Sequence, residues 1–175
     1  MNSQRSTHIV FSQQVIEFTT VVAECCRFLE NLTDIKKSDF TNRALKLFSL
    51  LYVKTVMLNI SDNQNDSAIE RFVGEDDYNF IKEKIAQILG EDDSFLDTFN
   101  PDMPFSDTPI AATVSENIAD VYQEIRDYAE NYQSENEQIM NDALTVCIES
   151  FGEHWGRKLL NAICALHALK FEIRS

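Results

Sequence analysis

Apolar residues recur every three or four positions in five stretches of the chain, which is the spacing that places them along one face of an α-helix. The stretches run from Phe11 to Leu32, from Ser38 to about Ile60, from about Ser67 to Leu89, from Thr113 to Tyr132 and from Ser134 to Lys170. With only three Pro and four Gly, the chain is also poor in the residues that a turn-rich β-sandwich needs. The pattern therefore predicts an all-α fold.

Capping sequences indicate where several of these helices begin. Three copies of Ser/Thr-x-x-Glu start at Ser67, Thr113 and Ser134, and in such a box the hydroxyl and the Glu side chain each satisfy a free backbone N–H. Ser38 or Asp39 is expected to cap the second helix. Gly90 is expected to end the third.

The last stretch is predicted to be one long helix, because its apolar residues keep one phase through Gly152 and Gly156. A kink is allowed near Gly152. Two glycines four residues apart suggest a face that another backbone approaches closely. Trp155, between them, is expected to pack in the core.

The fold predicted from these elements is a single-domain helical bundle over residues 1–175, with about six helices and the long C-terminal helix at its centre. Residues 1–8 are polar, and residues 1–10 are expected to be frayed. Residues 90–110 form a long loop rich in acidic and aromatic residues. Because disordered acidic segments contain few aromatics, the Phe side chains of this loop are expected to lie against the core.

Charge limits the classes of partner. Fifteen basic and 29 acidic residues give a formal net charge of -14, which should repel phosphate backbones and anionic lipids. Direct nucleic-acid binding and membrane association are therefore not expected, whereas a basic protein partner is. No stretch is long and apolar enough to predict a membrane span, and a cytoplasmic protein is expected. The four Cys lack metal-binding spacing and are interpreted as buried free thiols.

The candidate site is a polar cluster near the C-terminal helix. His154 and Arg157 are three residues apart and can share a helix face. A buried guanidinium needs a carboxylate, for which Asp120 is the first choice and Glu24 the second. The full predicted cluster contains Glu24, Asp120, Tyr122, His154, Arg157 and His167. It can be a structural network that fixes helix register or a site of acid–base chemistry, and both interpretations stay open.

Known catalytic patterns are missing from the sequence. There is no Gly-x-Ser-x-Gly elbow and no glycine-rich phosphate loop. The paired Glu-x-x-His helices of di-iron bundles are not reproduced either, because Glu153 and His154 are adjacent. No catalytic residue, metal ligand or cofactor is therefore predicted.

The segment from Phe151 to His167, with its His-Trp-Gly-Arg and Ala-Leu-His sequences, resembles the C-terminal signature of an uncharacterised bacterial family of small helical proteins, a domain of unknown function. The segments 23–30, 99–101 and 118–125 resemble other parts of the same family. This chain departs from the family pattern at Val121 and Glu124, where the family has Ile and Asp, and at Cys164, where the family has Arg. The resemblance implies a helical fold and carries no established activity.

Two functions remain as hypotheses. The favoured one is a non-enzymatic helical module that binds another protein through an acidic surface around Glu91 to Asp107. The alternative is an accessory factor or enzyme in nucleic-acid metabolism that uses a polar groove around His154 and Arg157. The sequence specifies neither the partner nor the oligomeric state.

Overall fold

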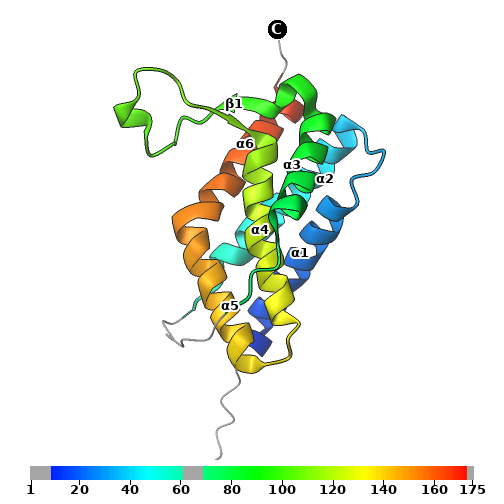
Figure 1. Cartoon of the computed structure of the whole chain (residues 1–175), viewed down its shortest axis with the longest axis vertical. Helices are drawn as coiled ribbons and strands as arrows, with labels where there is room; N and C mark the ends of the chain where they lie inside the picture. The colour runs from blue at the N-terminus through cyan, green and yellow to red at the C-terminus, as the bar shows by residue number, and fades with distance from the viewer. Residues whose placement is uncertain (1–8, 61–68, 173–175) are drawn as a thin grey trace, which may run out of the picture.

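The computed structural model describes residues 9–60 and 69–172, which form a bundle of six α-helices with a small two-stranded sheet at one end (Figure 1). The α-helices are α1 (Gln13–Glu30), α2 (Lys37–Val56), α3 (Glu75–Leu89), α4 (Val114–Tyr132), α5 (Glu137–Ser150) and α6 (Gly156–Phe171). The strands are β1 (Ser94–Leu96) and β2 (Ala111–Thr113). Short 3₁₀ turns occupy Ile9–Phe11, Gly90–Asp93 and Met103–Phe105. The predicted helical fold class is confirmed.

Helix α4 is the centre of the bundle, because it packs against α1, α3, α5 and α6. Its core-facing side chains, including Ile118, Val121 and Ile125, are fully buried. The prediction that the C-terminal helix is central was therefore wrong. Periodicity shows that a helix has an apolar face, but it does not show how many neighbours the helix has.

Three tyrosines of α4 fix its position along the N-terminal part of the chain. Tyr122 donates to Glu30 Oε1 at 2.9 Å, Tyr128 shares a 2.7 Å hydrogen bond with the Thr19 hydroxyl, and Tyr132 donates to the Val10 carbonyl at 2.8 Å. These contacts occur at successive levels of α1 and the turn before it. The rings of Tyr122 and Tyr128 pack in the core, and that of Tyr132 is partly buried against it, while each hydroxyl has a hydrogen-bond partner.

Helices α5 and α6 are joined by a π-helical turn, Phe151–Trp155, which confirms one continuous C-terminal helix. Trp155 is fully buried, as predicted, and its indole N–H donates to the Cys147 carbonyl at 2.8 Å. A Cβ on Gly156 would lie 2.5 Å from the Phe151 carbonyl oxygen, whereas a Cβ on Gly152 would meet nothing within 4 Å. The close approach predicted at the glycines therefore comes from the helix's own π turn, and only at Gly156.

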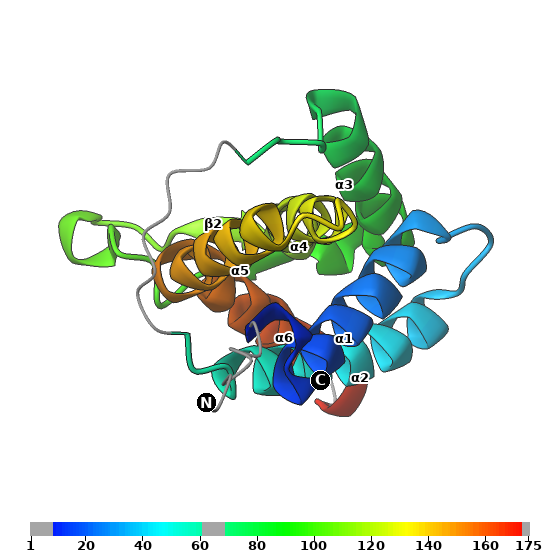
Figure 2. The same cartoon turned by 90° about the horizontal axis from the view of Figure 1, so that it is seen from below.

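Residues 94–113 form a β-hairpin, and its loop projects from the bundle on the side away from α1 and α3 (Figures 1 and 2). Strands β1 and β2 are antiparallel, with Ser94 opposite Thr113 and Leu96 opposite Ala111. The side chains of Phe99 and Phe105 in the intervening loop are 80% and 89% exposed. The expectation that the aromatic residues of this loop cover the core was therefore wrong for these two.

Aspartates attach the hairpin to the bundle. Asp93 is buried and accepts hydrogen bonds from the backbone N–H of Ser115 at 2.7 Å and from its hydroxyl at 2.6 Å. Asp97 is also buried and binds Arg157. Asp92 forms an ion pair with Lys37 at 2.8 Å. Much of the acidic charge predicted for a functional surface is thus used inside the fold.

Three of the four predicted helix starts differ from the structure and one agrees with it. Thr113 caps α4 by accepting from the Glu116 N–H at 3.3 Å, as predicted. Helix α5 is capped by Asn136 and not by Ser134. Helix α2 begins at Lys37, one residue before Ser38, and Lys36 at its N-cap makes no side-chain cap bond.

The start of α3 was predicted too early. The helix begins at Glu75, with Gly74 as its N-cap. Glu70 is not helical and Ser67 lies outside the described residues. Asp127 of α4 accepts the N–H groups of Phe72 and Val73 at 2.8 and 2.9 Å, so tertiary contacts satisfy the backbone that the capping box would have placed in a helix.

The expectation that residues 1–10 are frayed was wrong for Ile9 and Val10. Residues 1–8 lie outside the described part of the chain, but Ile9–Phe11 form a 3₁₀ turn in which Val10 is fully buried. Cys25, Cys26 and Cys147 are buried as predicted, whereas Cys164 is exposed on the outer face of α6. Among helices in the described ranges, none is both long and apolar enough to cross a membrane.

Candidate functional site

The predicted pairing of Arg157 with Asp120 was wrong. Arg157 Nη1 lies 3.2 Å from Asp97 Oδ2 of the hairpin. Asp120 instead accepts from the Tyr78 hydroxyl at 2.7 Å and lies 3.4 Å from Lys158 Nζ. Successive residues of a helix point about 100° apart, so Lys158 faces α4 while Arg157 faces the hairpin.

The other members of the predicted cluster also lie in separate contacts. His154 is exposed. His167 is exposed too, with its ring centroid 4.8 Å from that of Phe171. Glu24 is exposed and pairs with Arg27 on its own helix. Of the six residues, only Tyr122 lines the groove described next.

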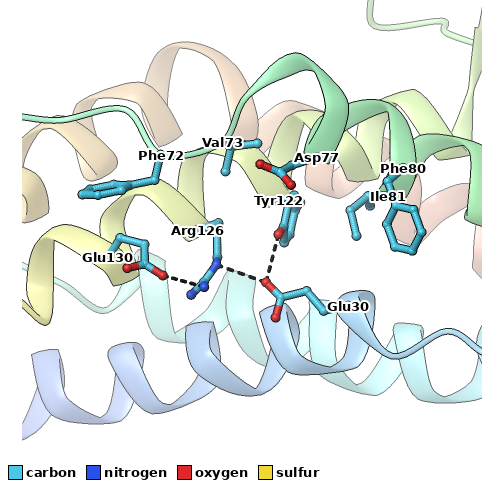
Figure 3. A pocket seen from close by; sticks show the side chains of 9 residues that line it. All are labelled: Glu30, Phe72, Val73, Asp77, Phe80, Ile81, Tyr122, Arg126 and Glu130. Carbon is cyan, nitrogen blue, oxygen red and sulfur yellow. Dashed lines mark hydrogen bonds and ion pairs between the residues drawn. The ribbon is translucent and has the colours of Figure 1, made fainter.

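The candidate groove lies between α1, α3 and α4 and encloses about 500 Å³. Figure 3 shows its lining residues, with Arg126 between two carboxylates. The lining consists of Glu30, Phe72, Val73, Asp77, Phe80, Ile81, Tyr122, Arg126 and Glu130. It therefore combines an apolar wall from α3 and the segment before it with a polar wall from α1 and α4.

A hydrogen-bonded chain of side chains forms the polar wall. Arg126 Nε lies 3.1 Å from Glu30 Oε1, and its Nη2 pairs with Glu130 one turn further along α4. Tyr122 donates to the same Glu30 oxygen at 2.9 Å. The lining contains three carboxylates, of Glu30, Asp77 and Glu130, and one guanidinium. At neutral pH the groove therefore has a formal charge of -2.

The apolar wall carries two aromatic rings that remain accessible. Phe72 and Phe80 are 44% and 52% exposed. The segment that holds Phe72 is fixed to α4, because Asp127 binds its backbone N–H and the Asn131 amide donates to the Glu70 carbonyl at 2.9 Å. The opening of the groove is thus formed in advance of any binding.

Burial raises the pKa of two groups at the groove, the Tyr122 phenol and the Cys26 thiol. Burial, and then the hydrogen bond to Glu30, raise the pKa of Tyr122 well above its usual value. Burial raises the pKa of the neighbouring Cys26 thiol to about 12. The lining contains no His, Ser or Cys. The lining is therefore suited to binding a molecule that carries a cationic group on an apolar stem. The Tyr122 hydroxyl stays protonated and acts as a hydrogen-bond donor.

Sequence reasoning missed most of the groove. Arg126 and Glu130 are four residues apart on a helix, a spacing that favours an ion pair and could have drawn attention to them. Glu30 ends α1, and Phe72 lies in a segment that was predicted to be helical. No local pattern relates these two residues to α4, because the groove exists only once the helices pack.

Fold and groove together define a small helical bundle with a preformed acidic groove. The chain belongs to the family described as domain of unknown function DUF5063, whose model matches residues 9–172. It is similar to protein BF1032 from Bacteroides fragilis, whose crystal structure covers 95% of this chain at 36% identity, with a TM-score of 0.83. The match covers 98% of that protein's chain. None of the curated proteins compared with the chain matches it.

Proposed function

We propose that this protein is a non-enzymatic interaction module whose candidate groove binds a basic segment of a partner protein. The observation that carries the proposal is the groove's composition: its carboxylates outnumber its guanidinium by two, and two accessible Phe rings line it as well. Lys and Arg side chains have apolar stems and cationic ends, so they match both walls.

The geometry favours a basic side chain over a small inorganic cation. The rings of Phe72 and Phe80 supply faces for an alkyl stem or a guanidinium plane. Glu30 uses one oxygen for both of its contacts in the described part of the chain, which leaves Oε2 for a cation from the partner. The net charge of -14 adds long-range attraction that salt screens.

The alternative, an accessory factor or enzyme in nucleic-acid metabolism, depended on a groove shared by His154 and Arg157. His154 is exposed to solvent and Arg157 binds the hairpin. Neither residue lines the candidate groove. No observation favours this alternative.

The test is binding of a fluorescent peptide that alternates Lys and Leu, measured by anisotropy against the full chain. We expect binding that weakens with salt, and a peptide with Glu in place of Lys should not bind. The variant Glu30→Gln with Glu130→Gln should weaken binding roughly tenfold or more.

The matched control removes the same two charges elsewhere, at the exposed Glu24 and Glu153. If both double variants weaken binding equally, only net charge matters and the groove is not the site. Phe80→Ala should weaken binding without changing the salt dependence, because it removes an apolar contact and no charge.

A further inference from the structure

Helices α2 and α6 are nearly free of acidic residues, since Asp39 in the first turn of α2 is the one acid that they contain. The sequence contains no Asp or Glu at positions 40–61 or 154–171, although the chain has 29 acids in 175 residues. The two helices pack side by side, with Lys170 donating to Asn42 at one end and Tyr52 against Phe151 further along. Glu17 of α1 pairs with Lys54 of α2 at 2.7 Å, but in so acidic a chain two packed helices that contribute one acid between them indicate a contact surface of their own.

Large apolar side chains are exposed on this surface. Val53 and Val56 are 52% and 55% exposed, although a helix of a bundle usually turns polar residues outward. The same two helices also expose the cations of Lys46 and Lys170. We call this surface the α2–α6 face, and define it by the exposed side chains of Leu50, Val53, Val56, Met57, Leu160 and Cys164.

The hairpin loop, residues 97–110, has the opposite character. Phe99 and Phe105 are almost fully exposed, and the carboxylates of Asp102 and Asp107 lie beside them on the loop. The base of the loop is held by the β1–β2 pairing and by the Asp97 N–H, which donates to the Ile110 carbonyl at 2.8 Å. The loop therefore presents aromatic and acidic groups from a fixed base.

We propose that the hairpin loop of one copy of this chain docks on the α2–α6 face of a second copy. The loop is apolar and acidic, and the face is apolar and basic, so the two surfaces complement each other in both respects. Exposed Phe side chains of this kind are typical anchors of protein interfaces. Their 80% and 89% exposure shows that the loop does not dock on its own chain.

Net charge does not oppose this contact at short range. Two chains of charge -14 repel each other, but physiological salt screens charges beyond about 8 Å. At contact distance the charges next to the interface determine the electrostatic interaction. Another acidic chain can therefore approach the α2–α6 face, whose defining residues include no acid. The proposal is independent of the candidate groove, because neither surface contains a groove residue.

Sedimentation equilibrium of the full chain tests the proposal. The weight-average mass should rise above 20.1 kDa as concentration increases. The loop variant Phe99→Ser with Phe105→Ser and the face variant Val53→Glu with Leu160→Glu should each weaken self-association by roughly tenfold to a hundredfold. All four positions are exposed, so both variants should fold, which circular dichroism verifies.

Mixing the two variants gives the decisive result. A mixture contains intact faces on the loop variant and intact loops on the face variant, so it should associate more strongly than either variant alone. The control variants Phe80→Ser and Val146→Glu make the same kinds of change at other exposed positions and should associate like the unmodified chain.

Two outcomes would overturn the proposal. If the unmodified chain stays monomeric over roughly a thousandfold range of concentration reaching about 1 mM, there is no docking between copies. If the loop variant associates normally while the face variant does not, the face contacts a second face and not a loop. Peptide binding by the candidate groove should be unchanged in the loop and face variants, which separates failure here from failure of the proposed function.

Discussion

Arg157 at the start of α6 binds the buried Asp97 of the hairpin, with 3.2 Å between Nη1 and Oδ2, although 60 positions separate the two residues in the chain. Asp97 is 3% exposed, whereas the Arg157 side chain is 32% exposed. The contact therefore places one charge in the interior and leaves the other partly in water. It also fixes the hairpin to the C-terminal helix.

Replacing Arg157 should destabilise the fold, because it leaves a buried carboxylate with little compensation. We expect Arg157→Ala to lower the free energy of unfolding by about 2 kcal/mol, less than for a fully buried pair because the guanidinium is partly solvated. A double-mutant cycle with Asp97→Ala should give a clear coupling energy. The same cycle with Asp120→Ala should give a value near zero, and a large value there would contradict the pairing seen in the structure.

The two glycines near Trp155 should respond in opposite directions to Ala. Gly156→Ala places a Cβ against the Phe151 carbonyl and ring, and should cost roughly 1 to 3 kcal/mol. Gly152→Ala meets no neighbour and should stabilise the helix by about 0.5 to 1 kcal/mol. Urea unfolding measures both effects. Equal effects at the two positions would show that the π turn does not control them.

The start of α4 should depend more on Asp93 than on Thr113. Asp93 is buried and accepts two short hydrogen bonds from Ser115, so Asp93→Ala should cost about 2 to 3 kcal/mol. Thr113→Ala removes one longer cap bond and should cost about 1 kcal/mol. Thermal unfolding ranks the two variants, and the reverse order would mean that the local capping box dominates.

Stability should fall at alkaline pH. Burial raises the pKa of Cys26 to about 12, from an ordinary value near 9. Its contribution to stability is therefore complete below about pH 9 and is lost as pH rises from there towards 12, by up to about 1.4 kcal/mol per pH unit. Cys26→Ala should flatten this part of the profile, measured by urea unfolding at several pH values. Cys164→Ala is the control, because that thiol is exposed; an equal change there would contradict the prediction.

The helices could be predicted from the sequence because an apolar stripe is a local property of each segment. The stripe through Val114, Ile118 and Ile125 gave α4 at nearly its observed length. Predictions of helix starts failed where a distant residue satisfies the backbone. Asp127 binds the N–H groups of Phe72 and Val73. The sequence around residue 72 contains no pattern that indicates this hydrogen-bond partner on α4.

The site was harder to predict because its residues meet only through tertiary packing. His154 and Arg157 lie on the same helical segment, but Arg157 binds Asp97 of the hairpin and His154 is exposed to solvent. Cys164 follows the helical period and was therefore expected in the core. It lies on an outer face that happens to be apolar. Periodicity alone cannot distinguish a buried stripe from an exposed one.

The π turn at Phe151–Trp155 means that the C-terminal helix contains one residue more than an unbroken α-helix with the same two ends. The five residues of the π turn accommodate the extra residue, so Leu144 before the turn and Leu159 after it both face the core. A chain shortened by one residue at Gly152 could form a regular helix and keep those contacts. The same deletion within α6 would rotate the following side chains by about 100°. The π turn is thus the point in this helix where a one-residue deletion can leave the core register unchanged.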